Sequence, residues 1–577
     1  MGRAMIVKVA DAIISPLGCS TEANYEAVKA GRSMLREYQW DSLPQSFVAS
    51  LMDWHGIVER EGMTRFEMMV VGVVEQLIPQ LSFDLSSSRV LFILSTTKGN
   101  VDLLEKDVSS PSSSVYLGDT AMKIVRHFGN PNRPVVVSNA CTSGLCAQIA
   151  AVRALESGRY DYAVVVGADI QSRFIISGFQ SFQALSPAPC KPFDAERRGL
   201  NLGEAAAAIV FQRVDQPKAG QWLCRKGAIR NDANHISGPS RTGEGSYRAL
   251  RTVMADVPKD DLAFVNVHGT STLYNDEMES IAIERAGLLD VPVNSLKGYY
   301  GHTMGAAGIL EVILSMRAIE DHTVLATRGF DHLGVSRHIK VSNVHAATSK
   351  NSFIKLLSGF GGCNAAMAFS RVTEDGAPSA PVKGNTPPDK PSLLTHSEIT
   401  LAPQKVTLNG KVLNTTQQGG ALLTELYRQY INDYPKFFKM DELTKLGFVA
   451  SELLLRMGDT VPKDTEEVAV ILFNRTSSLC NDRKYQATIS DMENFFPRPS
   501  LFVYTLPNIV TGEIAIRNRF FGETSFYVLD HEDPRLMHEM VVSALNEGVA
   551  RLIIYGWVDC EDADHFLAKM TCVERPV

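Results

Sequence analysis

A cysteine between a predicted strand and a predicted helix is the first residue that could do chemistry. Cys141 lies in SNACTSGL, directly after the β-branched run 135–137 and directly before an apolar stretch with helical spacing. A strand that passes at once into a helix presents such a side chain at the turn, where a substrate can reach it. Because a helix N-terminus favours negative charge, we expect the pKa of this thiol to be lowered and its thiolate fraction raised. A lone cysteine in an apolar stretch is more often a core residue, so this interpretation needs partners.

Two histidines are the candidate partners. His268 lies in VNVHGTST and His302 in KGYYGHTMG, each after a predicted strand and each followed by Gly or Thr. A condensation that forms a carbanion needs hydrogen-bond donors at the developing enolate oxygen. A neutral imidazole can donate from one ring nitrogen when the other is held as an acceptor. A single histidine of this kind is more often structural, but two in the same context favour a site with Cys141.

The elements that must position these residues are short buried strands alternating with helices. Four runs predict strands, at 89–95, 134–138, 162–167 and 263–267, and the stretch 144–157 predicts a helix closed by Gly158. This alternation predicts an α/β protein whose sheets are covered by helices.

Bulk composition narrows the function classes. A chain of 577 residues is too long for one core, and its net charge of −7 is unlike that of a nucleic-acid-binding protein. Its nine cysteines form no CxxC pair, which favours reduced thiols in a cytoplasmic protein without a metal site. We expect no signal peptide and no membrane span, because the longest apolar runs have only the length of strands.

The character of the chain changes after residue 372. Residues 373–397 are rich in Pro, Gly and polar side chains, and this predicts an exposed linker. Beyond it, SALNEG (543–548) matches RALESG (153–158), and SFYVL (525–529) falls on 135–139 without a gap. Residues 398–577 are therefore predicted to be a second, degenerate copy of the N-terminal half.

Five motifs then point to one family. ACTSG, CKPFDAERRGLNLGEAAA, HGTSTLYND, KGYYGHTMGAAG and SGFGGCNAA stand in the order and at the spacing of the β-ketoacyl synthases, which residues 5–372 resemble. These are Cys-His-His condensing enzymes of the thiolase superfamily. The resemblance implies a five-layered αβαβα core built from two similar halves, residues 1–215 and 216–372, followed by a smaller C-terminal α/β half-domain.

The resemblance also implies roles for the site residues. Cys141 would accept an acyl chain from an acyl carrier protein, and His268 and His302 would bind the malonyl thioester and stabilise the enolate left by its decarboxylation. The backbone N–H groups of Cys141 and Phe360 would form the oxyanion hole, and Phe360 would gate access to the thiol.

Other positions carry supporting roles in the same resemblance. Lys297 and Glu311 would orient and tune the histidines, and two acids would be structural, Asp276 and Glu279. Substrate-binding positions would be Thr270, Thr272, Gly359 and Gly361. No cofactor is implied, because the carrier protein brings its own phosphopantetheine.

The implied partners are an acyl carrier protein and a second subunit, either a second copy or a related synthase chain. Carrier proteins are acidic, so a basic docking patch is expected, with Arg65, Lys123 and Arg126 as candidates. Whether the acyl chains belong to fatty-acid, polyketide or polyene synthesis stays open.

Two other functions are weighed against condensation. The chain could be a non-condensing partner of the chain-length-factor type, but such subunits typically lack the cysteine that is intact here. A biosynthetic thiolase would need a second catalytic cysteine. Cys363 lies near the right place, but its GFGG context is that of the synthases.

The C-terminal segment is expected to be non-catalytic. His531 replaces Cys141 in the internal alignment, and no copy of either histidine motif follows. The segment could cap the active-site entrance or imitate a partner subunit. Its removal from about Thr373 is expected to leave Cys141 chemically competent.

Overall fold

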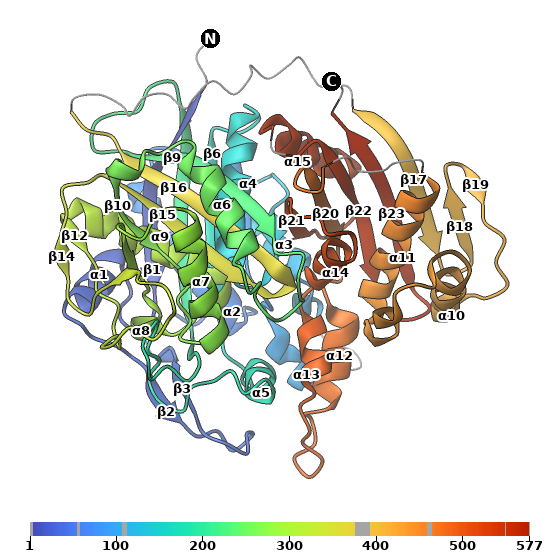
Figure 1. Ribbon diagram of the computed structural model, residues 1–577, viewed down its shortest axis with the longest axis horizontal. Helices are drawn as coiled ribbons and strands as arrows, with labels where there is room; N and C mark the ends of the chain where they lie inside the picture. The colour runs from blue at the N-terminus through green and yellow to red at the C-terminus, as the bar shows by residue number, and fades with distance from the viewer. Residues whose placement is uncertain are drawn as a thin grey trace.

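The computed structural model describes residues 4–54, 58–106, 112–374, 393–458, 464–548 and 550–575. We call residues 4–374 the core and residues 393–575 the tail. In Figure 1 the core runs from blue to yellow, and the tail, in orange to dark red, lies beside it.

The core contains two sheets with the same topology. In the first sheet β4 pairs in parallel with β5 and β6, β6 pairs antiparallel with β8, and β8 pairs antiparallel with β1. In the second sheet β10, β11, β15, β16 and β9 repeat this scheme, and β13 extends it beyond β11. The strands are β1 (Met5–Ile14), β4 (Val90–Ser95), β5 (Val135–Val137), β6 (Tyr162–Asp169), β8 (Ala205–Val214), β9 (Trp222–Asn231), β10 (Leu262–Asn266), β11 (Pro292–Asn294), β13 (Lys340–Val341), β15 (Ser352–Gly359) and β16 (Cys363–Arg371).

Helices complete five layers. α4 (Ser143–Glu156) and α9 (Ala307–Glu320) contact each other and strands of both sheets, so they form the central layer. α2 (Arg65–Glu75) covers the outer face of the first sheet, and α6 (Glu244–Met254) covers that of the second. The predicted α/β fold with its αβαβα layers is therefore confirmed. β4 is buried along its whole length, which explains its uninterrupted apolar sequence.

Three smaller sets of elements complete the core. Short strands β2 (Arg36–Tyr38), β3 (Phe47–Ser50) and β7 (Leu202–Gly203) form a separate sheet, and β12 (Thr323–Val324) pairs with β14 (Ala346–Ala347). The remaining core helices are α1 (Thr21–Lys29), α3 (Leu117–His127), α5 (Arg173–Ser181), α7 (Leu273–Arg285) and α8 (Lys297–Tyr300).

The tail repeats the topology of the first sheet. β20 pairs in parallel with β21 and β22, β22 pairs antiparallel with β23, and β23 pairs antiparallel with β17, which continues into β18 and β19. These strands are β17 (Leu394–Ala402), β18 (Lys405–Leu408), β19 (Lys411–Val412), β20 (Val468–Asn474), β21 (Thr524–Val528), β22 (Leu552–Cys560) and β23 (Phe566–Glu574). β17, the first strand of the tail, begins at Leu394, four residues before the boundary predicted at 398.

Helices flank this third sheet as well. α11 contacts β17, β22 and β23, α14 contacts β20 and β21, and α15 contacts β22 and also α4 of the core. The tail helices are α10 (Gly419–Leu426), α11 (Glu442–Met457), α12 (Leu479–Ala487), α13 (Pro499–Phe502), α14 (Ile509–Asn518) and α15 (Pro534–Asn546). In the described part of the chain, no helix is both long and apolar enough to span a membrane.

The first sheet of the core and the sheet of the tail meet edge to edge at β5 and β21. The strands are antiparallel, with Tyr527 opposite Val137, and the Ser138 N–H donates to the Phe526 carbonyl at 3.1 Å. The internal sequence alignment also places Tyr527 on Val137, so an approximate two-fold axis passes through this pair. The first half of the core and the tail are thus related as two copies of one half-domain facing each other.

Candidate active site

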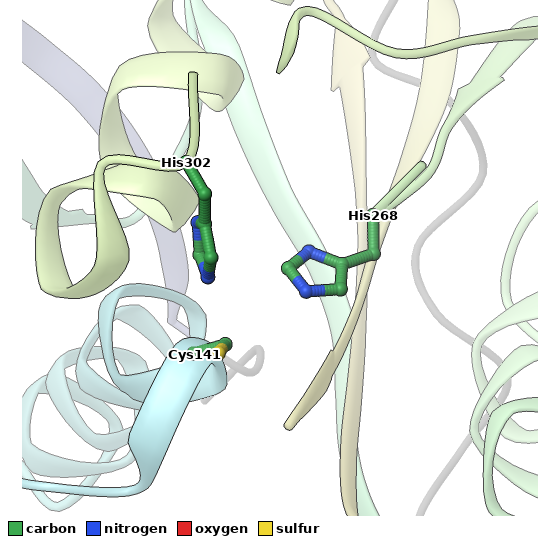
Figure 2. Close-up of side chains that lie close together, drawn as sticks. All are labelled: Cys141, His268 and His302. Carbon is green, nitrogen blue, oxygen red and sulfur yellow. The ribbon is translucent and has the colours of Figure 1, made fainter. Parts of the chain in front are cut away.

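The nucleophile candidate sits in a 3-10 turn (Ala140–Thr142) between β5 and α4. Ala140 adopts a left-handed conformation at φ 49°, and the Asn139 N–H donates to Ser143 Oγ at 2.8 Å, which together hold the sharp turn. Figure 2 shows Cys141 facing His268 and His302 across a small space. The thiol sulfur and one nitrogen from each imidazole lie within 4.8 Å of one another.

The electrostatics of Cys141 differ from the sequence expectation. Burial raises the pKa of the thiol to about 12, although Lys297 and the backbone N–H groups of Cys141 and Phe360 act in the lowering direction. The predicted lowering by the helix N-terminus was therefore wrong in its net direction, because removal of the sulfur from water outweighs those groups. The thiol is therefore protonated in the resting protein, and a nucleophilic role would require loss of this proton.

The two histidines are neutral and rigidly held. The N–H groups of His268 and Gly269 both donate to Glu279 at 2.7 Å, while Asp276 accepts from the Phe193 N–H at 2.7 Å and from the Ser271 N–H. Both acids thus have the structural role expected for them. Burial, followed by nearby Lys297, places the pKa of each imidazole well below its usual range.

The tautomer of His302 follows from its contacts. Its Nδ1 accepts the Met304 N–H at 3.3 Å, so the ring proton is on Nε2. That Nε2 is buried and has no hydrogen-bond partner among the described residues. A buried donor without a partner is costly, and an oxygen of a bound substrate would satisfy it.

A buried ion cluster lies behind the histidines. Lys297 and Glu311 form the expected ion pair, and the second carboxylate oxygen of Glu311 pairs with Lys355. All three side chains are almost completely buried. Sequence reasoning missed Lys355, although a lysine inside the apolar run SFIKLLSG was a usable signal.

The predicted oxyanion loop follows β15. Phe360 begins a 3-10 turn (Phe360–Gly362) and directs its backbone N–H at the Cys141 sulfur. Gly359 packs so closely that a Cβ there would lie 3.3 Å from the Cys141 nitrogen. Gly361 has φ 84°, and its N–H donates to the Ile236 carbonyl.

A tail residue contacts this loop, which sequence reasoning did not anticipate. Asn508, just before α14, donates from Nδ2 to the Phe360 carbonyl at 2.8 Å. Thr524 of β21 bonds through its carbonyl to Asn139, two residues before the nucleophile. The tail therefore contacts both segments that carry the predicted oxyanion N–H groups.

Two predicted substrate-binding threonines and Cys363, the cysteine considered for a thiolase mechanism, lie in different places. Thr270 and Thr272 lie in the loop after His268, with their hydroxyls 3.0 Å apart. Cys363 is buried behind the turn, with its sulfur 3.3 Å from Thr142 Oγ1, so it is not part of the Cys141 cluster. This position argues against a second catalytic cysteine of the thiolase kind.

The three docking candidates do not form one free basic patch. Lys123 pairs with buried Glu67 at 2.5 Å, and Arg65 lies over the Trp54 ring. Arg126 lines an open surface pocket of about 360 Å³ together with Lys123 and two acids, Asp119 and Asp530. The acids reduce the positive character on which the docking prediction depended.

The raised pKa of Cys141 predicts its alkylation behaviour. In the free protein the rate of iodoacetamide reaction at Cys141, followed by peptide mass mapping, is expected to rise about tenfold per pH unit between pH 7 and 9, because the thiolate fraction does so below the pKa. Cys19, which is exposed, is mapped in the same samples as the reference site. A pH-independent rate at Cys141 over this range would contradict the raised pKa.

Comparisons with known proteins agree with this geometry. The family models "Beta-ketoacyl synthase, N-terminal domain" and "Beta-ketoacyl synthase, C-terminal domain" match residues 118–216 and 223–331. A 3-oxoacyl-[acyl-carrier-protein] synthase 2 of Rhizobium meliloti (strain 1021) is 27% identical over 420 residues, covering 64% of this chain and 99% of the relative.

Solved structures are similar as well. A ketosynthase in complex with its chain length factor from Xenorhabdus doucetiae superposes with a TM-score of 0.57 at 25% identity, over 64% of this chain and 98% of that one. A keto synthase-chain length factor protein, PfaC, shares the fold over 99% of this chain and 78% of its own, with a TM-score of 0.75 at 14% identity. Together with the Cys-His-His cluster and the five-layered core, these matches identify residues 118–216 and 223–331 as the N-terminal and C-terminal domains of a β-ketoacyl synthase.

Proposed function

We propose that the protein catalyses decarboxylative Claisen condensation between an acyl group on Cys141 and a malonyl group on an acyl carrier protein. The observation that carries the proposal is the cluster of Cys141 with two neutral imidazoles, whose reactive atoms lie within 4.8 Å of one another. The names of its relatives, 3-oxoacyl-[acyl-carrier-protein] synthases and polyketide ketosynthases, support the same reaction class.

The first half-reaction transfers the acyl group. The Cys141 sulfur attacks the carbonyl of the incoming thioester, and the N–H groups of Cys141 and Phe360 stabilise the oxyanion. The thiol proton passes to the departing phosphopantetheine thiolate as the carbon–sulfur bond of the incoming thioester breaks. The two imidazoles stay neutral in this exchange, because the pKa of each lies well below its usual range.

The second half-reaction forms the carbon–carbon bond. The malonyl thioester loses CO₂, and its carbonyl oxygen becomes an enolate that accepts hydrogen bonds from His302 Nε2–H and from the ring N–H of neutral His268. The enolate carbon attacks the acyl-Cys141 carbonyl, the carbon–sulfur bond breaks, and the Cys141 thiolate takes up a proton from water. We propose no cofactor held by the chain itself, since decarboxylation drives the reaction and the carrier protein supplies phosphopantetheine.

We further propose that the tail is a degenerate copy of the N-terminal half that takes the place of a partner subunit. The support is its matching strand order and the two-fold pairing of β21 with β5. Among the described residues, the tail has no cluster of three thiol, imidazole or carboxylate groups, and His531 at the position of Cys141 pairs only with Asp530 and Arg133.

This arrangement bears on the expected dimer. Because β21 already occupies the edge of β5, a second copy cannot pair with that edge. A homodimer or heterodimer through β5 is therefore not proposed, and the acyl carrier protein remains the proposed partner. The nine free cysteines support the proposed cytoplasmic setting.

Intact-protein mass spectrometry tests the proposed function. Wild type incubated with acyl-carrier proteins of several chain lengths is expected to gain one acyl group, and Cys141→Ala is expected to gain none. Addition of malonyl-carrier protein should then discharge the adduct as a β-ketoacyl product.

The alternative, a non-condensing partner of the chain-length-factor type, predicts a different result. In that case wild type gains no adduct at any chain length, and malonyl-carrier protein is not decarboxylated. Intact Cys141 and the neutral histidine pair favour condensation.

A further inference from the structure

Lys355 is a buried cation to which neither the motifs nor the proposed mechanism gives a role. It lies on β15, five residues before Phe360, and its side chain is completely buried. Its Nζ donates to Asn266 Oδ1 at 2.6 Å and to the Val267 carbonyl at 3.1 Å, and it forms an ion pair with Glu311. Three acceptors around one nitrogen match the three donors of a protonated ammonium group.

The contact with Val267 connects Lys355 to the active site. Val267 immediately precedes His268, so the ammonium group holds the backbone on one side of this histidine. Glu279 holds the other side by accepting the N–H groups of His268 and Gly269. The imidazole is therefore fixed between a buried cation and a buried acid.

Lys355 also changes the charge of the cluster. Glu311 is shared by two lysines, Lys297 and Lys355, so the three side chains carry one more positive charge than negative. Both imidazoles experience this charge, since Lys297 and Lys355 each lower the pKa of His268 and of His302. A positive potential beside the imidazoles favours neutral donors and stabilises negative charge that develops between them.

We propose that Lys355 is a positioning residue for enolate formation, which holds His268 through the Val267 carbonyl and supplies the second cation behind the histidine pair. This inference rests on the proposed condensation. It assigns Lys355 to the malonyl half-reaction and not to acyl transfer, because its contacts lead to His268 and Glu311 and not to Cys141 or Phe360.

Separate assays of the two half-reactions test this assignment. Lys355→Met removes the charge and all three donors, and Lys355→Gln keeps a donor for the Val267 carbonyl without the charge. Both are expected to lower decarboxylation of malonyl-carrier protein 10- to 100-fold while acylation of Cys141 stays within threefold of wild type. Lys355→Arg, which keeps the charge, is expected to recover most of the decarboxylation rate. Lys350→Met, at an exposed lysine just before β15, is the matched control.

The pH profile gives a readout that a merely structural role would not change. Burial lowers the pKa of Lys355 to about 8. Glu311 and Glu279 oppose this lowering, and Lys297 adds to it. The charge is present below this pKa and is lost as the pH rises through it. Decarboxylation by wild type is therefore expected to decline above about pH 8, and the two uncharged variants should lack this decline.

The outcomes separate this inference from the function on which it depends. A wild type that neither accepts an acyl group nor decarboxylates malonyl-carrier protein contradicts the proposed function itself. If wild type is active and folded Lys355→Gln decarboxylates within twofold of it, the role of Lys355 is refuted. A parallel loss of acylation and decarboxylation refutes it too. If Lys355→Met does not fold, Lys355→Gln and Lys355→Arg carry the comparison.

Discussion

Removal of the tail is expected to leave a protein of residues 1–374 that neither stays in solution nor forms an acyl adduct at Cys141. This reverses the expectation from sequence, and the reason is the contact between the tail and the core. Deletion would expose the edge of β5, which now pairs with β21. It would also remove Asn508 from the Phe360 carbonyl and Thr524 from Asn139, so both segments of the proposed oxyanion hole lose a support.

Apolar packing across the same contact adds a larger energetic loss. Phe502 of the tail packs its ring against three core phenylalanines, Phe174, Phe179 and Phe182, at centroid distances of 6.2, 5.6 and 6.0 Å. Each large apolar side chain buried contributes about 1.5–3 kcal/mol, while a whole domain is stable by only about 5–15 kcal/mol. Uncovering several such side chains at once is therefore enough to unfold the core or make it aggregate.

A protease site placed within residues 375–392 gives the matched control. Cleavage of the folded protein there should leave two fragments that co-elute from a sizing column and still acylate Cys141. Residues 1–374 expressed alone should be insoluble or inert in the same mass assay. A soluble fragment 1–374 acylated at the full-length rate would show that the tail is dispensable.

Replacement of His302 by alanine is expected to lower decarboxylation and condensation about a thousandfold or more, with Cys141 still acylated. The imidazole donates from Nε2 because Nδ1 accepts the Met304 N–H, and alanine removes this donor entirely. Acyl transfer depends instead on the N–H groups of Cys141 and Phe360.

The measurement pairs acyl-adduct formation with CO₂ release from malonyl-carrier protein. His302→Gln, whose amide can donate in place of Nε2–H, should retain more decarboxylation than His302→Ala. His538→Ala, at an exposed position of α15, controls for loss of a histidine elsewhere. Equal losses in acylation and decarboxylation would show that His302 also acts in acyl transfer.

Local signals in the sequence were enough to predict much of this molecule. The strand–turn–helix around Cys141 and the strand ends before the histidines are encoded by neighbouring residues, so their places could be predicted. The tail topology was detectable because its alignment on 135–139 and 153–158 needs only short matching runs. The end of the linker was predicted too late in the chain. The local sequence gives no strand signal at Leu394–His396, and these residues belong to β17 because that strand pairs with β23.

What the sequence did not reveal depends on contacts between distant segments. Lys355 acquires its partners only when β15 lies beside β10 and α9 brings Glu311 to it. Asn508 meets Phe360 across 148 residues of chain. The pKa of Cys141 is set by how completely the folded protein removes the sulfur from water, and no local motif encodes this quantity.

The edge-to-edge joining of β5 and β21 within one chain also fixes how the assembly responds to dilution. Two separate subunits that meet at such an edge come apart as their concentration falls. Here the tail is tethered to the core, at an effective concentration of about millimolar. Each polypeptide carries one Cys141 cluster and one tail, so the two are always present in a constant ratio. The enzyme can therefore keep its working form at expression levels where a two-chain equivalent would dissociate.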